Sequence, residues 1–137
     1  MIGIIDCNNF YASCERNFNP KIEKLPVVVL SNNDGAVIAR SEEAKALGID
    51  MAIPMFEVLK VIEQYGIVKY SSNYTLYGDM SARIKSIIRQ FAPNVEDYSI
   101  DESFVDLAGL DYINLFDYVK LMRDNITQSS GIPVSIE

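Results

Sequence analysis

The chain has 137 residues, and 49 % of them are hydrophobic, which is enough for a compact domain with a buried core. Its 12 Lys and Arg residues stand against 19 Asp and Glu residues. The resulting formal charge of -7 argues against a self-sufficient nucleic-acid clamp, although a catalytic module whose basic surface lies on another domain stays compatible with it.

The residue types that are absent or rare exclude further classes of site. The sequence has no His, which excludes His-based triads, imidazole acid–base catalysis and most zinc sites. The two cysteines, Cys7 and Cys14, have no further Cys or His with which to complete a tetrahedral metal site. We expect free thiols in a reducing cytoplasm. The start "MIGIID" predicts a strand rather than a signal peptide, and no apolar run is long enough for a membrane span.

Short apolar runs alternate with helical patterns along the first half of the chain. Ser41 is a typical N-cap and Gly48 a typical helix end, so a short helix is expected between them. Gly35 suits a turn because it can take a positive φ. The expected elements are a strand at 2–6, a helix at 10–18, strands at 25–30 and 36–40 on either side of a turn at 31–35, and a helix at 41–48.

The second half continues with longer helical patterns. Pro54 in a first turn and Gly66 after the last turn mark one amphipathic helix, and Pro93 ends another. The apolar face of that second helix is expected to run through Leu76, Met80, Ile84, Ile87, Ile88 and Phe91. The expected elements are helices at 54–66 and within 73–93, strands at 67–72, 95–100 and 103–107, a helix at 114–130 and a strand at 132–137.

This order of elements predicts an α+β fold. The outer parts read strand, helix, helix, strand, strand, helix, strand, which fits a split βαβ (ferredoxin-like) sheet. Residues from about 18 to 75 would form an insertion with strands and helices of its own. We find no internal repeat and no low-complexity linker.

Three carboxylates stand at the ends of predicted strands. Asp6 ends the first strand, and the adjacent pair Asp101 and Glu102 lies between the two strands of a hairpin. If those strands are neighbours, the three groups converge and repel one another unless cations neutralise them. Two Mg²⁺ ions about 4 Å apart would make this a site for in-line phosphoryl transfer. From position alone, Asp6 equally fits a helix cap and the acid pair a solvated turn.

Three motifs occur in an order and spacing that make the match specific: "DCNNFYASCE", "PVVVLSNNDGAVIARSEEAKALGI" and "YSIDESFVDL". Together they resemble the Y-family translesion DNA polymerases, nearest to the UmuC-like group that forms the catalytic subunit of bacterial polymerase V. The resemblance covers essentially the whole chain. It implies that residues 1–17 and 75–137 form the palm subdomain and that residues 18–74 form the fingers.

The resemblance also implies a metal site and a nucleotide site. Asp6, Asp101 and Glu102 would be the catalytic, metal-binding acids, and the backbone carbonyl of Cys7 would complete the site for two Mg²⁺ ions, for which Mn²⁺ could substitute. The residues implied to contact the incoming nucleotide are Tyr11 as steric gate against a ribose 2′-hydroxyl, the backbone N–H groups of Asn9 and Phe10 on the triphosphate, Lys45 and, less strongly, Arg40 on phosphate, and Ala36 with Ile38 over the nascent base pair.

Several of these residues have simpler interpretations without the family pattern. Tyr11 would then be a core aromatic, and Lys45 a solvated helix residue. Many relatives have a phosphate-contacting Tyr three residues before the cation; Glu42 stands there, so that role is not carried over. Packing explains Tyr70, Tyr74 and Tyr77 better than a base-stacking platform does.

The resemblance implies template-directed nucleotidyl transfer in DNA damage bypass and repair, with primer-template DNA and dNTP as substrates. Family members are considerably longer, and the rest of the palm, the thumb and the little finger lie outside this sequence. We therefore interpret the chain as a fragment with little or no activity alone. A UmuD-like dimer, a recombinase filament and the sliding clamp are implied partners of the complete protein, which would act at the nucleoid.

Two other functions remain open. The chain could be a non-catalytic interaction domain that keeps a palm fold. A phosphoacceptor receiver domain also places acids at strand ends, but it needs an acid pair after the first strand, where "IIDCNN" offers one acid.

Overall fold

The computed structural model describes residues 2–32, 35–108 and 114–137. Two positions of the expected turn at 31–35, Asn33 and Asp34, lie outside the described residues. The chain divides into two compact units: residues 1–8 with 75–137 form the first unit, and residues 9–74 form the second.

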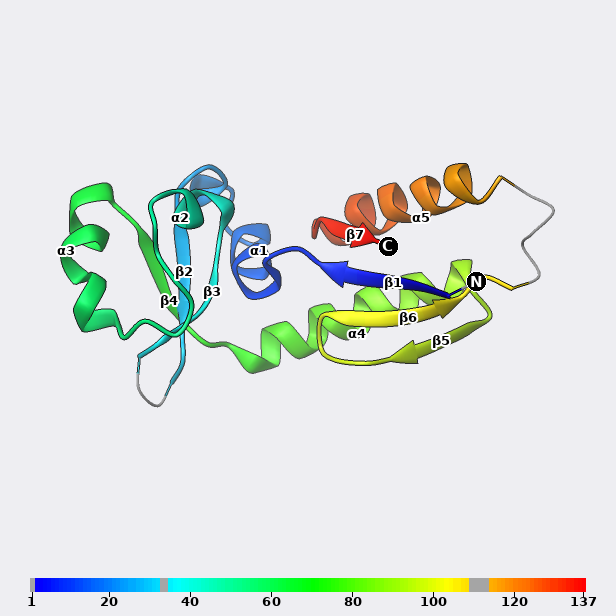
Figure 1. Ribbon diagram of the computed structural model, residues 1–137, viewed down its shortest axis with the longest axis horizontal. Helices are drawn as coiled ribbons and strands as arrows, with labels where there is room; N and C mark the ends of the chain where they lie inside the picture. Colours follow the sequence, from blue (N-terminus) through cyan, green and yellow to red (C-terminus); the bar gives the residue numbers. More distant parts are fainter. Residues whose placement is uncertain (1, 33–34, 109–113) are drawn as a thin grey trace. The chain divides into compact units, whose positions relative to one another are not determined.

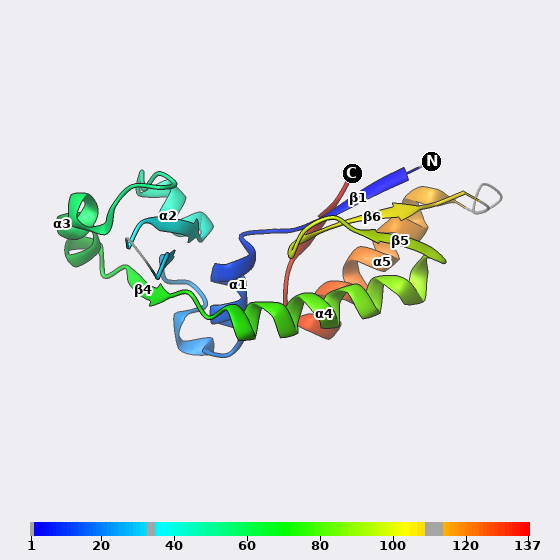
Figure 2. The ribbon, with the colours of Figure 1, turned by 90° about the horizontal axis from the view of Figure 1, so that it is seen from below.

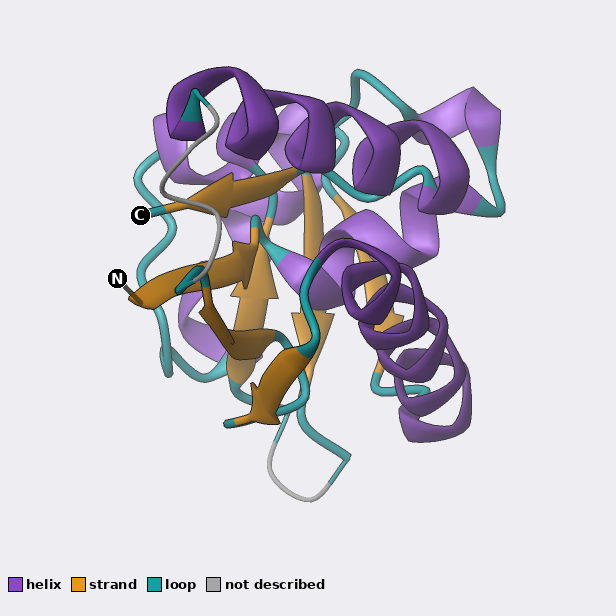
Figure 3. Cartoon of the chain, turned by 90° about the vertical axis from the view of Figure 1, so that its right-hand side faces the viewer, coloured by secondary structure: helices purple, strands orange, loops and turns teal. Residues whose placement is uncertain are grey.

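The first unit has a four-stranded sheet in the order β5-β6-β1-β7, and every neighbouring pair is antiparallel (Figures 1 and 3). Two helices connect these strands, so the chain order β1, α4, β5, β6, α5, β7 is the predicted split βαβ arrangement. The bounds are β1 Ile2–Cys7, α4 Tyr74–Phe91, β5 Asn94–Asp97, β6 Glu102–Asp106, α5 Leu115–Ser130 and β7 Val134–Ile136.

Both helices of the first unit cover the same face of its sheet (Figure 2). Alternate residues of β1 and β6 are therefore buried, as Ile5 and Val105 are, against apolar side chains of α4 and α5 such as Ile84 and Met122. Residues of the opposite parity, which include Asp6, point to the face without helices. The period of two thus determines which face of the sheet carries the acids.

The second unit is built around a three-stranded sheet in the order β3-β2-β4, with β2 antiparallel to β3 and parallel to β4. All residues of β2 are buried. Val28 belongs to one hydrophobic cluster of the unit and Val27 to another. A central strand buried on both faces explains the continuous apolar run "VVVL". The bounds are α1 Phe10–Asn17, η1 Pro20–Ile22, β2 Val27–Leu30, β3 Val37–Arg40, α2 Glu42–Ala46, α3 Met55–Tyr65 and β4 Val68–Ser71.

The predicted helix ends are largely confirmed. The Ser41 hydroxyl accepts a hydrogen bond from the Ala44 amide at 3.2 Å, and Gly66 ends α3 in the left-handed conformation with φ of 63°. Pro54 is the N-cap of α3 and lies outside its first turn, because its ψ of 142° is extended rather than helical. Gly35 has a φ of 67°, as the turn requires.

The buried face of α4 differs from the expected one at its edges. Tyr77 and Ser81 are buried, whereas Leu76 and Phe91 are only half-buried. Tyr77, Met80, Ser81, Ile84 and Ile88 follow the helical spacing of three and four residues, and this face points to the core. Of the tyrosines expected to pack rather than to stack on bases, Tyr77 is fully buried, while Tyr74 is 54 % exposed.

The segment 9–17 belongs to the second unit, since α1 packs against β2 and β3. The division into a palm of residues 1–17 and 75–137 and fingers of residues 18–74 stays a prediction. Cys7 and Cys14 are both buried, and no disulfide joins them in the described part of the chain. No helix among the described residues combines the length and apolarity needed to cross a bilayer.

Candidate functional site

Three acids converge at the end of β1. The strands β1 and β6 are antiparallel neighbours, and Asp6 is registered opposite Glu102. Asp101 lies one residue before β6, and its carbonyl accepts a hydrogen bond from the Cys7 amide at 2.9 Å. One carboxylate oxygen from each of Asp6, Asp101 and Glu102 lies within 4.8 Å of the others. The structure thus brings together three of the sequence-predicted ligands.

The hairpin tip that carries the acid pair is anchored from two sides. The Ser99 hydroxyl donates to the Asp101 carboxylate at 3.0 Å and lies 3.5 Å from a Glu102 oxygen. Two side chains one turn apart on α4 bind the tip's backbone: the Ser81 hydroxyl donates to the Ile100 carbonyl, and the Lys85 ammonium donates to the Ser99 carbonyl. These three supporting residues were missed in the sequence, and the one available signal was the spacing of four residues between Ser81 and Lys85 on α4.

The three carboxylates repel one another electrostatically. Partial burial raises the pKa of Asp6, and the negative charges of Asp101, Glu102 and Glu137 raise it further. A cluster of this kind favours a bound cation. An all-oxygen donor set without His or thiolate suits a hard divalent ion such as Mg²⁺ or Mn²⁺.

Removing the Asp6 charge should stabilise the metal-free protein. A carboxyl whose pKa is raised in the folded state holds its proton more tightly there, so stability falls as the pH rises from its ordinary value of 3.8 through the raised value. In EDTA at pH 7, Asp6→Asn should therefore unfold at a higher urea concentration than the unsubstituted chain. The difference should disappear below pH 3.8.

Saturating Mg²⁺ should reverse the order of stability, since only the chain with all three acids gains binding energy from the ion. Asp106→Asn removes a charge from the same face of the sheet without touching the cluster and is the matched control. A lower stability of Asp6→Asn in EDTA at pH 7 would contradict the electrostatic account.

A second polar cluster lies within the second unit, where α1 and α2 begin. The Lys45 ammonium donates to the Asn9 side-chain oxygen at 2.6 Å and lies 3.1 Å from a Glu42 carboxylate oxygen. That same Glu42 oxygen accepts a hydrogen bond from the Asn9 amide nitrogen at 3.0 Å. The hydrogen bond from Asn9 lowers the pKa of Glu42, and the bond to Lys45 and the charges of Lys45 and Arg40 lower it further. The structure therefore places Lys45 in a closed ring with a neighbouring acid.

The candidate residues in and just before β3 alternate with buried ones. Ala36, Ile38 and Arg40 are half-buried and alternate with the buried Val37 and Ala39. Arg40 is partly committed to the fold, because its Nη1 donates to the Ile49 carbonyl at 2.6 Å. Its Nε is buried and has no hydrogen-bond partner among the described residues. The Arg40 guanidinium thus supports the fold through Nη1, while its Nε–H has no acceptor among the described residues.

The two aromatic residues at the start of α1, Phe10 and Tyr11, differ in burial. The Phe10 side chain is buried in the core, and Tyr11 is half-buried. The Tyr11 ring packs edge-on against Tyr74, with the centroids 6.2 Å apart and the planes at 85°. The Tyr74 ring therefore limits the positions that the Tyr11 side chain can take.

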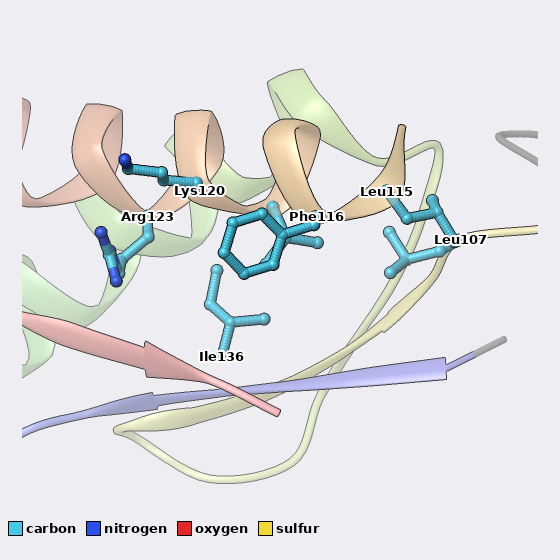
Figure 4. Close-up of a pocket in the computed structure, with 7 residues that line it drawn as sticks. Leu107, Leu115, Phe116, Lys120, Arg123 and Ile136 are labelled. Atoms are coloured by element: carbon cyan, nitrogen blue, oxygen red, sulfur yellow. The ribbon is translucent and has the colours of Figure 1, made fainter. Parts of the chain in front are cut away.

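Figure 4 shows a hollow that does not involve the acids. This groove of about 560 Å³ lies along α5 and is lined by apolar side chains that include Leu107, Phe116 and Ile136, with Lys120 and Arg123 at one end. None of its described lining residues is a carboxylate, so the groove and the acid cluster are separate features of the first unit.

Comparison with known proteins gives a consistent result. The profile of the impB/mucB/samB family matches residues 5–136. Protein SamB of Salmonella typhimurium is 43 % identical over 99 % of this chain and 32 % of its own length. Protein UmuC of the same species is 44 % identical with the same coverage. DNA polymerase IV of Caulobacter vibrioides is 31 % identical over 98 % of this chain and 34 % of its own length.

Solved structures show the same fold. An insertion ternary complex of Dbh DNA polymerase superposes with a TM-score of 0.89 at 25 % identity, covering 99 % of this chain and 42 % of that one. DinB from Sulfolobus solfataricus gives a TM-score of 0.87, also at 25 % identity, and covers 99 % and 41 %. The chain thus spans about a third of the length of the curated relatives it matches.

Proposed function

Because this chain belongs to the impB/mucB/samB family of Y-family DNA polymerases, we propose that it is the N-terminal catalytic part of a translesion DNA polymerase. The observation that supports this most is the approach of Asp6, Asp101 and Glu102 to within 4.8 Å, from two strands that are adjacent in the sheet and distant in the chain. The reaction would be template-directed nucleotidyl transfer in DNA damage bypass.

The acids would hold two Mg²⁺ ions, with the Cys7 carbonyl as a further oxygen ligand. When bound, such ions neutralise the charge of an incoming triphosphate and lower the pKa of a primer 3′-hydroxyl. The hydrogen bonds from the Cys7 amide and the Ser99 hydroxyl would hold Asp101 in place before the ions bind. Metal binding would then cost less conformational entropy of this side chain.

The nucleotide-contacting residues are proposed individually. Tyr11 would exclude a ribose 2′-hydroxyl by its volume, and Lys45 would neutralise phosphate charge. The amides of Asn9 and Phe10 at the start of α1 would donate to phosphate oxygens, a use to which helix N-termini are suited. Ala36, just before β3, and Ile38 within it would cover the nascent base pair, and Arg40 at the end of β3 would add positive potential near phosphate.

The whole protein's substrates and partners follow from the same assignment. Primer-template DNA and dNTP would be the substrates. A UmuD-like dimer, a recombinase filament and the sliding clamp would be the partners of a chain of the relatives' length, acting in the cytoplasm at the nucleoid. We expect the 137-residue chain alone to extend primers poorly, since its formal charge of -7 gives it little grip on a duplex.

Metal-dependent nucleotide binding tests the proposal. In a Mn²⁺ titration followed by isothermal calorimetry in the presence of dATP, the chain should bind the ion and nucleotide together. Asp101→Ala should weaken this binding about tenfold or more, because one anionic ligand and the hydrogen bond from Ser99 are lost. Asp106→Asn should bind as the unsubstituted chain does.

Two outcomes would speak against the assignment. Absence of binding at millimolar metal would favour a non-catalytic interaction domain that keeps the palm fold. Equal losses in Asp101→Ala and Asp106→Asn would indicate a general effect of charge on the sheet face rather than a metal site.

A further inference from the structure

We propose that the Glu42 carboxylate occupies the phosphate position at Lys45 when no nucleotide is bound, so that an incoming phosphate has to displace it. Glu42 would then set the affinity for the nucleotide as an internal competitor. The inference rests on the proposed phosphate contact of Lys45 and adds a residue to which the family resemblance gives no role.

The first support is the geometry around one carboxylate oxygen. Glu42 Oε1 receives the Asn9 amide at 3.0 Å and lies 3.1 Å from the Lys45 ammonium. A phosphate oxygen offers the same properties as this carboxylate oxygen, namely a negative charge and several lone pairs for N–H donors. The donor set that binds Glu42 is thus chemically able to bind a phosphate in its place.

The second support is that the contact is weak enough to be exchanged. The Glu42 side chain is 74 % exposed and that of Lys45 is 37 % exposed, and they are paired at a spacing of three residues on α2. Exposed pairs of this kind contribute little free energy, because water and salt compete with them. A magnesium-bound triphosphate carries several charges and brings further contacts, so it can replace a single carboxylate.

The third support is that the Asn9 side chain binds Lys45 and Glu42 instead of capping α1. It is the N-cap of α1, yet its side chain makes no capping hydrogen bond within the described α1. Its backbone is left-handed, with φ of 49° and ψ of 50°. The amide group instead binds Lys45 through its oxygen and Glu42 through its nitrogen. Once Glu42 leaves, the amide nitrogen has a donor to offer to the replacing anion.

The neighbouring acid shows that this arrangement is specific to one residue. Glu43 lies beside Glu42 in the first turn of α2, but its carboxylate pairs with Arg16 at 2.8 Å. Arg16 also donates to the Leu25 carbonyl, so Glu43 contributes to packing between segments of the second unit. Two adjacent acids in the same helix turn therefore have different partners, and of the two it is Glu42 that engages the predicted phosphate-binding lysine.

The test is a nuclear magnetic resonance titration of the complete 137-residue chain with dATP and Mg²⁺, followed at the amides of α1 and α2. Glu42→Gln keeps the size of the side chain but removes its charge, and it should tighten dATP binding about two- to fivefold, the range expected from losing an exposed ion pair. Glu63→Gln, on the exposed side of α3, removes the same charge and should leave the affinity unchanged. Lys45→Gln should weaken binding.

A second readout follows the carboxylate itself. The Glu42 side-chain carbon resonance reports its pKa, which is lowered in the nucleotide-free chain. Saturation with dATP should move this pKa back toward the ordinary value, because the carboxylate loses Asn9 and Lys45 as partners. A Glu42 that merely stabilises α2 would not respond.

The outcomes separate the two proposals. Unchanged or weaker binding by Glu42→Gln, with weakened binding by Lys45→Gln, would overturn the competitor role and leave the phosphate contact standing. Unchanged binding by Lys45→Gln, together with loss in Asp101→Ala, would overturn the phosphate contact and the competitor role while leaving the metal site in place. Equal tightening in Glu42→Gln and Glu63→Gln would overturn the inference as well, since the loss of any negative charge would then be responsible.

Discussion

Glu102→Ala should reduce primer extension on the order of 10³-fold in a polymerase of the relatives' length that carries this chain as its N-terminal third. Glu102 is the first residue of β6 and is registered opposite Asp6, so its side chain points to the sheet face that has no helices. Its loss would leave the metal site with two of its three carboxylates. Charge stabilisation by a metal is worth several kcal/mol in phosphoryl transfer, which corresponds to this loss of rate.

The measurement is single-turnover extension of a labelled primer at saturating dNTP, which reports the chemical step rather than binding. Asp106→Asn, four residues further along β6 on the same face, is the control and should extend at nearly the unsubstituted rate. Its side-chain oxygen can still accept the Ala108 amide, at 2.9 Å in the structure, so the strand end is preserved. A Glu102→Ala enzyme that keeps a tenth or more of the rate would contradict a catalytic role.

The site acids were predictable because two simple patterns determine them. Asp6 ends an apolar run at the N-terminus, and the acid pair sits between two runs that alternate with a period of two, so strands were expected on both sides. Their adjacency in space was a conditional inference, because pairing of β1 with β6 depends on contacts about 100 residues apart, and local patterns carry no information on them.

The supporting residues were not predictable for a related reason. Ser81 and Lys85 look like ordinary polar positions of a helix, and only the tertiary structure shows that both bind the backbone of the hairpin tip. Glu42 was noted as a departure from the family pattern, but its contact with Asn9 joins residues 33 positions apart. The sequence predicts which groups would do chemistry, and the structure shows which groups hold the acids in place.

Tyr77 and Tyr74 show how tertiary contacts separate residues with the same local pattern. Both lie on the first turn of α4 in a Tyr-rich segment, yet Tyr77 is fully buried and Tyr74 is half-exposed. Tyr77 is spaced from Met80, Ser81 and Ile84 by three to seven residues, which puts it on the helix face that packs against the sheet. Tyr74 is the first residue of α4 and belongs to the second unit, where its ring packs against that of Tyr11.

Tyr11→Ala should raise the incorporation of ribonucleotides relative to deoxyribonucleotides about 10- to 100-fold in the same full-length context, with deoxyribonucleotide extension retained. The proposed gate acts by volume: forcing a hydroxyl into a filled space costs about 1–3 kcal/mol, and removing the ring removes that cost. Tyr11→Phe keeps the ring and should keep the discrimination. The measurement is the ratio of kcat/KM for dATP and ATP opposite the same template base.

The contact between the Tyr11 and Tyr74 rings allows a second variant to be compared in this test. Tyr74 meets Tyr11 edge-on at 6.2 Å, and this pairing limits the positions that the Tyr11 ring can adopt. Tyr74→Ala should therefore relax discrimination by a smaller factor than Tyr11→Ala does, and the double variant should discriminate no less than Tyr11→Ala alone, since Tyr74 would act only through the ring that is missing. Unchanged discrimination in Tyr11→Ala would contradict the gate, and additive effects of the two substitutions would show that Tyr74 contacts the nucleotide independently.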